Sequence, residues 1–130
     1  MVLHVLRPDP GRDRPEAPRV WLMEPVLYVL DQHRRIAVEP DFKLWSAWMM
    51  DLARRTVGHD EAQPGLFVTT LFSGMDHRAV VTDPPMVFET TVHRIRGVEH
   101  EYVDAAEYAF WGEALAGHRA QVRAWRKREP

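Results

Sequence analysis

Two strand-like segments, residues 66–73 and 86–94, constrain the fold of this chain more than any other feature. In the first segment Val68 and Phe72 fall on one face, while Leu71 falls on the other. Because both faces carry apolar side chains, this segment is typical of a strand in the interior of a sheet. Together the two segments predict the centre of a small antiparallel sheet.

The connection between these segments, residues 74–85, is twelve residues long. That length exceeds a tight hairpin turn and approaches the length at which loops commonly carry function. Asp76 and His77 stand near its beginning, where they place a carboxylate and an imidazole at the end of a strand. This loop is therefore the first candidate for a functional site.

A first helix is predicted over residues 40–54. Pro40 suits the first turn of a helix, and Phe42, Trp45 and Leu52 recur at helical spacing. Trp48 or Met49 falls on the same stripe. The other face carries Asp41, Lys43, Ser46 and Asp51, which indicates a helix with one apolar face.

A second helix is predicted over residues 110–127, where apolar residues again recur at helical spacing. The stripe consists of Trp111, Leu115, His118, Val122 and Trp125. A glycine inside a helix lowers its stability, so we expect Gly117 to allow a close approach between this helix and the sheet.

The residues before the second helix carry two conflicting signals. Asp104 and Glu107 have the spacing of a capping box, which predicts a helix that begins at Ala105. Residues 101–103 favour a strand instead. The residue pattern leaves this boundary open.

Further strands are predicted at residues 26–30 and 55–59, with a turn over 60–65. With the two central strands, they indicate an α+β domain. We expect an antiparallel sheet of four or five strands with two helices, residues 40–54 and 110–127, packed on one face.

Length and composition set further bounds. The chain has 130 residues, which suits one domain with a single core. Its net charge of -2 gives no overall attraction to nucleic acid or to acidic membranes, and the lack of cysteine excludes disulfides and thiolate metal sites. No apolar run approaches the roughly 20 residues of a membrane span. We therefore expect a cytoplasmic protein.

The N-terminal part of the sequence differs from the rest. Residues 7–19 contain four prolines and four arginines, a composition that neither pairs into a sheet nor continues a helix. We expect residues 1–22 to form an extended or disordered arm and residues 23–130 to form the folded domain.

Four segments together suggest a relationship to known sequences. They read Pro-Val-Leu-Tyr-Val-Leu-Asp at 25–31, Thr-Thr-Leu-Phe-Ser-Gly-Met-Asp-His at 69–77, Pro-Pro-Met-Val-Phe-Glu-Thr-Thr-Val at 84–92 and Tyr-Ala-Phe-Trp-Gly-Glu-Ala-Leu-Ala-Gly-His at 108–118. In this order they resemble a family of small, functionally uncharacterised proteins that bacteriophages and prophages encode. The resemblance implies a phage origin and implies no activity.

The resemblance also bears on the open boundary. It implies a helix that begins near Trp111, with residues 102–108 extended. This chain departs from the family pattern at Phe110, where the family has a Ser or Thr helix cap, and at Thr91, where the family has Met. The departure at Phe110 weakens the expected cap of that helix.

Asp76, His77, Glu89 and His118 are the polar residues that could build a catalytic or metal site. Asp76, His77 and His118 could bind a divalent metal, or His77 could act as a general base that an acid orients. In the structural alternative, Asp76 caps the loop and satisfies a ring nitrogen of a buried His118. Strand alternation also directs Glu89 away from the core. The pattern favours the structural alternative, and we expect no metal or other cofactor.

Two other groups of residues are candidates for partner binding. The basic end of the second helix carries Arg119, Arg123, Trp125 and Arg126. These residues could contact nucleic acid through charge and stacking, although a solvated helix end that complements the helix dipole is the commoner reason for such a run. Met50 falls off the apolar stripe of the first helix, so it is a candidate for a protein interface, including a homodimer.

We therefore expect a small phage or prophage accessory protein that acts by binding a host or phage protein in the bacterial cytoplasm. Modulation of a host process or defence is one form that this binding could take. The competing function is a small metal-dependent or acid–base enzyme that uses Asp76, His77 and His118. Nucleic-acid binding through the basic C-terminal helix is a third alternative.

Overall fold

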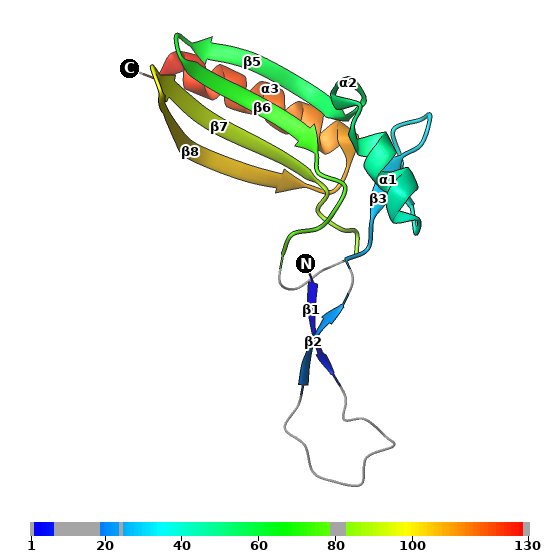
Figure 1. Ribbon diagram of the computed structural model, residues 1–130. Helices are drawn as coiled ribbons and strands as arrows, with labels where there is room; N and C mark the ends of the chain where they lie inside the picture. The colour runs from blue at the N-terminus through cyan, green and yellow to red at the C-terminus, as the bar shows by residue number, and fades with distance from the viewer. Residues whose placement is uncertain (1, 7–18, 24, 79–82, 129–130) are drawn as a thin grey trace, which may run out of the picture.

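The computed structural model describes residues 2–6, 19–23, 25–78 and 83–128. At its centre lies a four-stranded antiparallel sheet in the order β5-β6-β7-β8 (Figure 1). These strands are β5 (Thr56–Gln63), β6 (Leu66–Phe72), β7 (Phe88–Arg96) and β8 (Glu99–Tyr108). The remaining elements are β1 (Val2–Leu6), β2 (Arg19–Met23), β3 (Tyr28–Leu30), β4 (Ile36–Val38), α1 (Phe42–Met49), α2 (Leu52–Arg55) and α3 (Trp111–Lys127). The predicted α+β fold is confirmed.

Alternation in the central strands divides the sheet into a covered face and an open face. Val68, Thr70 and Phe72 of β6 are fully buried, whereas Thr69 and Leu71, which alternate with them, are half-buried. Pairing sets Val68 opposite Val92 and Phe72 opposite Phe88, so the buried residues of both strands lie on the covered face. The two segments that the sequence marked as central strands are therefore adjacent and antiparallel.

Helix α3 closes the covered face (Figure 1). Its buried residues recur every three or four positions, as an amphipathic helix requires. They are Ala114, His118, Val122 and Trp125, while Trp111 and Leu115 are half-buried. Val122 and Trp125 pack with Leu66, Val68 and Val92 in one apolar cluster. The predicted stripe of the second helix is thus confirmed.

The boundary before α3 follows the strand signal. β8 continues to Tyr108, and its residues 105–108 pair with β7 at every position. This pairing gives hydrogen-bond partners to the backbone N–H and C=O groups of residues 105–108. A helix that began at Ala105 would have broken these bonds to β7. α3 begins at Trp111, and the side chain of Phe110 supplies no capping hydrogen bond.

The helix that we predicted over residues 40–54 is divided in two. Asp41 caps α1 by accepting the backbone N–H groups of Lys43 and Leu44. Asp51 then caps α2 by accepting the N–H of Arg54, and this second cap separates the two helices. The side chain of Asp51 thus competes with backbone carbonyl groups for the N–H groups that a continuous helix would use.

α1 lies near the end of the same face that α3 covers. The ring of Trp48 meets the ring of Phe72 edge-on, with centroids 5.5 Å apart. Trp48 and Met49 also pack against the buried cluster that contains Phe72 and Phe88. Both long helices therefore cover one face of the sheet, as predicted.

The strand expected at residues 26–30 does not join the central sheet. β3 pairs with β4 in a separate two-stranded sheet. This small sheet is held to the loop after β6, because the N–H of Tyr28 donates to the carbonyl of Gly74 at 2.8 Å. β5 is also longer than predicted, since the residues we expected in a turn at 60–63 continue the strand.

At the N-terminus, β1 and β2 pair with each other as an antiparallel hairpin (Figure 1). We expected an extended or disordered arm over residues 1–22, and residues 7–18 of that arm lie outside the described part of the chain. None of the helices that the structure describes is long and apolar enough to cross a membrane.

Gly117→Ala tests the close approach of α3 to the sheet. An added Cβ at Gly117 would overlap the ring of Tyr108, whereas one at Gly112 would meet nothing within 4 Å. We expect Gly117→Ala to lower the free energy of unfolding by about 1–3 kcal/mol because of this overpacking. Gly112→Ala, the control, should raise it by up to about 1 kcal/mol. Urea unfolding measures both, and equal effects would contradict the packing role of Gly117.

Candidate functional site

The structure distributes the four predicted site residues over three places. Asp76 and His77 lie in the loop that follows β6, and His118 lies in the middle of α3. Glu89 pairs with Leu71 on the open face of the sheet. The hydrogen bonds of Asp76 and those of His118 involve different partners, so the set does not form one cluster.

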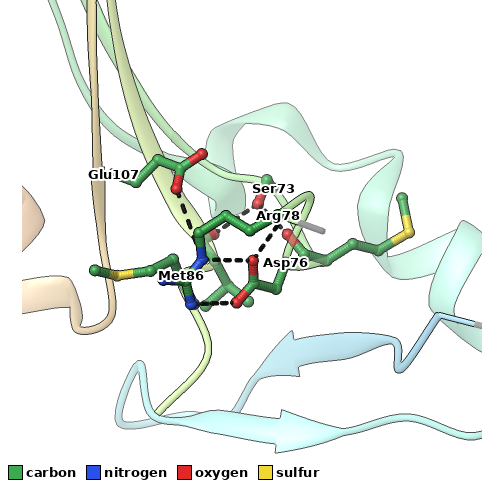
Figure 2. A network of polar contacts seen from close by, with 7 residues as sticks. Ser73, Asp76, Arg78, Met86 and Glu107 are labelled. Atoms are coloured by element: carbon green, nitrogen blue, oxygen red, sulfur yellow. Dashed lines mark hydrogen bonds and ion pairs between the residues drawn. The ribbon is translucent and has the colours of Figure 1, made fainter. Parts of the chain in front are cut away.

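Asp76 closes the long loop (Figure 2). Its Oδ1 atom accepts hydrogen bonds from the backbone N–H of Arg78 at 3.1 Å and from Nε of Arg78 at 3.0 Å. Its Oδ2 atom accepts from Nη2 of Arg78 at 2.7 Å and from the backbone N–H of Met86 at 2.9 Å. The carboxylate therefore joins the start of the loop to its end.

The charge state of Asp76 follows from these contacts. Hydrogen bonds from the side chain of Arg78 lower the pKa of Asp76 from 3.8 to about 2, although burial alone would raise it. In return, the carboxylate raises the pKa of Arg78. A carboxylate with so low a pKa is a weak general base at neutral pH. His77, next to it, is exposed and forms no hydrogen bond with the described residues.

His118 belongs to a different network. Its Nε2 atom lies 2.6 Å from Oδ2 of Asp60, and its Nδ1 atom lies 2.7 Å from the hydroxyl of Thr70. The hydroxyl of Thr70 lies 2.6 Å from that of Thr90. The network therefore links α3 to β5, β6 and β7, and it satisfies both ring nitrogens of a residue that is only 3% exposed.

Gly58 makes room for this histidine. A Cβ atom at Gly58 would lie 2.5 Å from the Cδ2 and Nε2 atoms of His118. The imidazole consequently packs directly against the backbone of β5. Gly58 and the two hydrogen-bond partners of the ring, Asp60 and Thr70, together fix its position.

The order of Asp60, His118 and Thr70 is that of an acid, a base and a hydroxyl nucleophile. Nucleophilic attack requires a hydroxyl that a substrate can reach. Thr70 is completely buried, and its oxygen already bonds to both His118 and Thr90. The arrangement therefore holds the helix to the sheet and offers no accessible nucleophile.

No group of three or more His, Asp or Glu residues in the described part of the chain is arranged to hold a metal ion. The weak metal candidates were Asp76, His77 and His118. Asp76 is engaged by Arg78 and Met86, and His118 is engaged by Asp60 and Thr70. Of the three candidates, His77 is the one without a hydrogen bond to the described residues.

The open face of the sheet carries a row of rings that the sequence reasoning missed. His59 stacks on Phe67 at 5.6 Å between centroids, and Phe67 stacks on His93 at 5.7 Å. The row continues to Tyr102 on β8, 6.3 Å from His93. Each ring comes from a different strand, and strand pairing places the four rings at neighbouring positions across the sheet. The row therefore depends on the register between strands, which the pattern within one strand does not give.

The charges on this face limit what the ring row could bind. Burial, and then the nearby His100 and His59, lower the pKa of His93, so it is neutral at physiological pH. Glu89 pairs directly with Glu107 on the same face. Stacked rings suit nucleic-acid bases, whereas these two carboxylates, four and five positions along their strands from His93 and Tyr102, add negative charge to the same face.

The predicted partner-binding residues differ in exposure. Met50 is 84% exposed, and Arg119, Arg123 and Arg126 are exposed on α3. Trp125, which we considered for stacking on bases, is buried, and the guanidinium of Arg128 covers its ring at 3.9 Å. The basic helix end therefore presents charge without a free aromatic ring.

Comparison with known proteins identified no relative, since no family model, no curated protein and no solved structure matches this chain. The geometry of the described residues is therefore the basis for any functional conclusion.

Thr70→Val tests the network around His118. The substitution preserves the shape of the side chain but removes the hydroxyl that bonds to His118 and Thr90. Leaving buried polar groups without partners should lower the free energy of unfolding by about 1–3 kcal/mol. Thr91→Val, at a half-buried position on the open face, is the control and should change stability much less. A negligible effect of Thr70→Val in urea unfolding would disprove the network's structural role.

Asp76→Asn tests the loop closure. Because the folded-state pKa of about 2 lies below the ordinary 3.8, ionised Asp76 stabilises the fold above that ordinary value and loses this effect as the pH falls toward 2. The variant should lose roughly 2 kcal/mol at neutral pH, and the difference from wild type should shrink in acid. His77→Asn is the control and should match the wild type. A difference that does not change with pH would be inconsistent with this assignment.

Proposed function

We propose that this chain is a small phage or prophage accessory protein that acts by binding a host or phage protein in the cytoplasm of a bacterial cell. The four segments that resemble a phage-encoded family support the origin. The exposed apolar residues of α1 and its surroundings support the mode of action. Modulation of a host process or defence is one form of this function.

The observation that carries the proposal is the surface of α1. Six of its eight residues are apolar, yet the helix has no buried residue. Helices in globular domains gain most of their stability by burying an apolar face. Trp48 and Met49 are half-buried against the domain, but Leu44 is 58% exposed and Phe42 is 65% exposed. The domain thus covers only part of the apolar surface of its own helix.

The exposed apolar surface continues past α1. Met50 is 84% exposed, and Leu52, the first residue of α2, is 57% exposed. Met is frequent in interface cores because its flexible side chain adapts to different partners. Gathered apolar residues that a soluble domain leaves in water are typical of a protein interface.

The candidate catalytic groups support binding over catalysis. Arg78 neutralises Asp76, and His118 is engaged in the core by Asp60 and Thr70. A small metal-dependent or acid–base enzyme would need to release these groups from contacts that hold the loop and the helix. Protein binding requires no such rearrangement.

A binding experiment with surface variants tests the proposal. Tagged wild type, Met50→Glu, Leu44→Glu and the control Val98→Glu are used for quantitative affinity purification from bacterial cells that carry the phage or prophage. Val98 is fully exposed in the turn between β7 and β8, at the end of the sheet away from α1. A charge placed in the interface should weaken capture at least tenfold, and the control should not.

The captured protein is then purified and titrated by calorimetry against the same variants, with circular dichroism to confirm their fold. Direct binding that Met50→Glu or Leu44→Glu weakens supports the proposal. A wild type that enriches no protein above an unrelated bait would refute it, and so would binding that all the variants retain equally.

A further inference from the structure

β8 forms one edge of the central sheet. In the order β5-β6-β7-β8 it is bonded to β7 on one side, and Figure 1 shows it as the outermost strand. None of the other strands that the structure describes pairs with its outer side. The outer side of an edge strand presents backbone N–H and C=O groups that can pair with a strand of another chain.

This edge lacks several features that commonly protect an edge strand. Proteins often keep such strands short or place lysine or proline in them. β8 has 10 residues, which makes it the longest strand of the sheet, and it contains neither lysine nor proline. The opposite edge, β5, is shorter and is interrupted twice by shifts in register, whereas β8 is interrupted once. Of the two edges, β8 therefore offers the longer run of backbone to a partner.

A bulge in the middle of β8 sets the pattern of this edge. Val92 of β7 pairs with Asp104, but the next residue of β7, His93, pairs with Tyr102. Val103 is therefore an extra residue in β8, and the alternation along the strand shifts by one at this point. Two residues on either side of the bulge consequently point the same way when they lie an odd number of positions apart.

Four residues of β8 direct their backbone hydrogen-bonding groups outward. The N–H of Ala105 donates to Oδ1 of the neighbouring Asp104 at 2.9 Å, which indicates that this N–H points away from β7. Alternate residues of a strand point the same way, with the shift at the bulge. The outward residues are His100, Tyr102, Ala105 and Glu107.

We propose that two copies of this chain form a dimer in which their β8 strands pair antiparallel, so that two four-stranded sheets become one continuous sheet. In this pairing His100 lies opposite Glu107 of the second copy, and Tyr102 lies opposite Ala105. A two-fold axis repeats both pairs and makes the assembly closed. The edge is separate from the proposed partner surface, which consists of residues 42–52.

The outward residues select this register. It pairs each outward residue with an outward residue of the second copy, and it places the two bulges opposite each other. A slip by one residue would set outward groups against inward groups along the strand. A slip by two would do so beside the bulge, where the alternation shifts.

The side chains of the paired residues are complementary in this register. The imidazole of His100 can donate a hydrogen bond to the carboxylate of Glu107. Tyr102 is 71% exposed in the single chain, and the small side chain of Ala105 opposite leaves room for its ring. The two Tyr102 rings take diagonal positions, where aromatic side chains reach each other. The ring rows of the two sheets would thus meet at the axis.

The acidic residues of β8 do not oppose this pairing directly. Glu101 and Glu107 lie 3.9 Å and 4.0 Å from the guanidinium nitrogens of Arg94 and Arg78, so arginines of the same chain offset part of their charge. In the proposed register no carboxylate lies directly opposite another. Asp104 would release the N–H of Ala105, which then donates to the carbonyl of Tyr102 in the second copy.

Sedimentation velocity on the full chain is the first test, with Ala105→Pro as the variant. Proline has no N–H to donate and is tolerated in an edge strand where that N–H faces solvent. We expect a dimer for the wild type and a folded monomer for Ala105→Pro, with circular dichroism to confirm the fold. Leu44→Glu, on the proposed partner surface, is the control and should remain a dimer. A wild type that is monomeric at all accessible concentrations would overturn the proposal, and so would a dimer that persists in Ala105→Pro.

A charge exchange tests the register without changing the backbone. His100→Glu sets two carboxylates opposite each other and should weaken dimerisation by roughly tenfold or more. The double variant His100→Glu/Glu107→Lys restores opposite charges across the interface and should recover the dimer. A double variant that dimerises no better than His100→Glu alone would contradict this pairing.

Disulfide formation gives an independent test, since the chain has no native cysteine. Directly paired residues of antiparallel strands have Cα atoms about 4.5–5.5 Å apart, which is within the range of a disulfide. A tagged Tyr102→Cys variant mixed with an untagged Ala105→Cys variant should form a covalent heterodimer under mild oxidation. Val98→Cys in place of Tyr102→Cys should form none. Equal cross-linking in the two mixtures would disprove the proposed register.

Discussion

The position of α3 on the sheet depends on one buried imidazole. His118 stands in the middle of the apolar stripe that closes the core, so both its ring nitrogens need partners inside the protein. Asp60 and Thr70 supply them from two different strands. Because hydrogen bonds are directional and the ring also packs on Gly58, the helix has one position along the sheet in which all contacts form. Apolar packing alone would tolerate a wider range of positions.

Asp76 performs a comparable task at the end of the sheet. Its carboxylate gathers the N–H groups of Arg78 and Met86, so the two ends of a twelve-residue connection meet at one side chain. The loop also contacts the small β3–β4 sheet through Gly74 and Tyr28. Asp76 and His118, two of the residues proposed for an active site, thus organise the connections between layers. Their hydrogen bonds to protein groups suit a structural role, whereas a general base needs a free lone pair for the proton of a substrate.

Local patterns in the sequence predicted the elements whose residues repeat regularly. The alternation in residues 66–73 and the helical spacing in residues 111–127 each reflect one buried face. Each element can therefore be predicted from its own residues, without knowledge of its partners in the fold. The partners of His118 could not be predicted in this way, because Asp60 and Thr70 are 58 and 48 positions away in the chain. Their proximity depends on strand register. The division of the first predicted helix at Asp51 could have been predicted locally, because an aspartate is more favourable at a helix cap than in a helix interior. The helical spacing of the apolar residues continues through this position and gives no sign of the break.

The two halves of the molecule differ in how completely they bury their apolar residues. The central sheet and α3 enclose a core in which Val68, Phe72 and Val92 have no exposed surface. The segment from β3 to α2 has a similarly apolar sequence but leaves many of those residues in water. Apolar surface in water is unfavourable. A domain can keep such a segment when the segment forms an interface, or when the folded core is stable enough to offset the unfavourable exposure. The closed core of the central sheet thus lies beside a layer in which the described residues leave much of the apolar surface exposed.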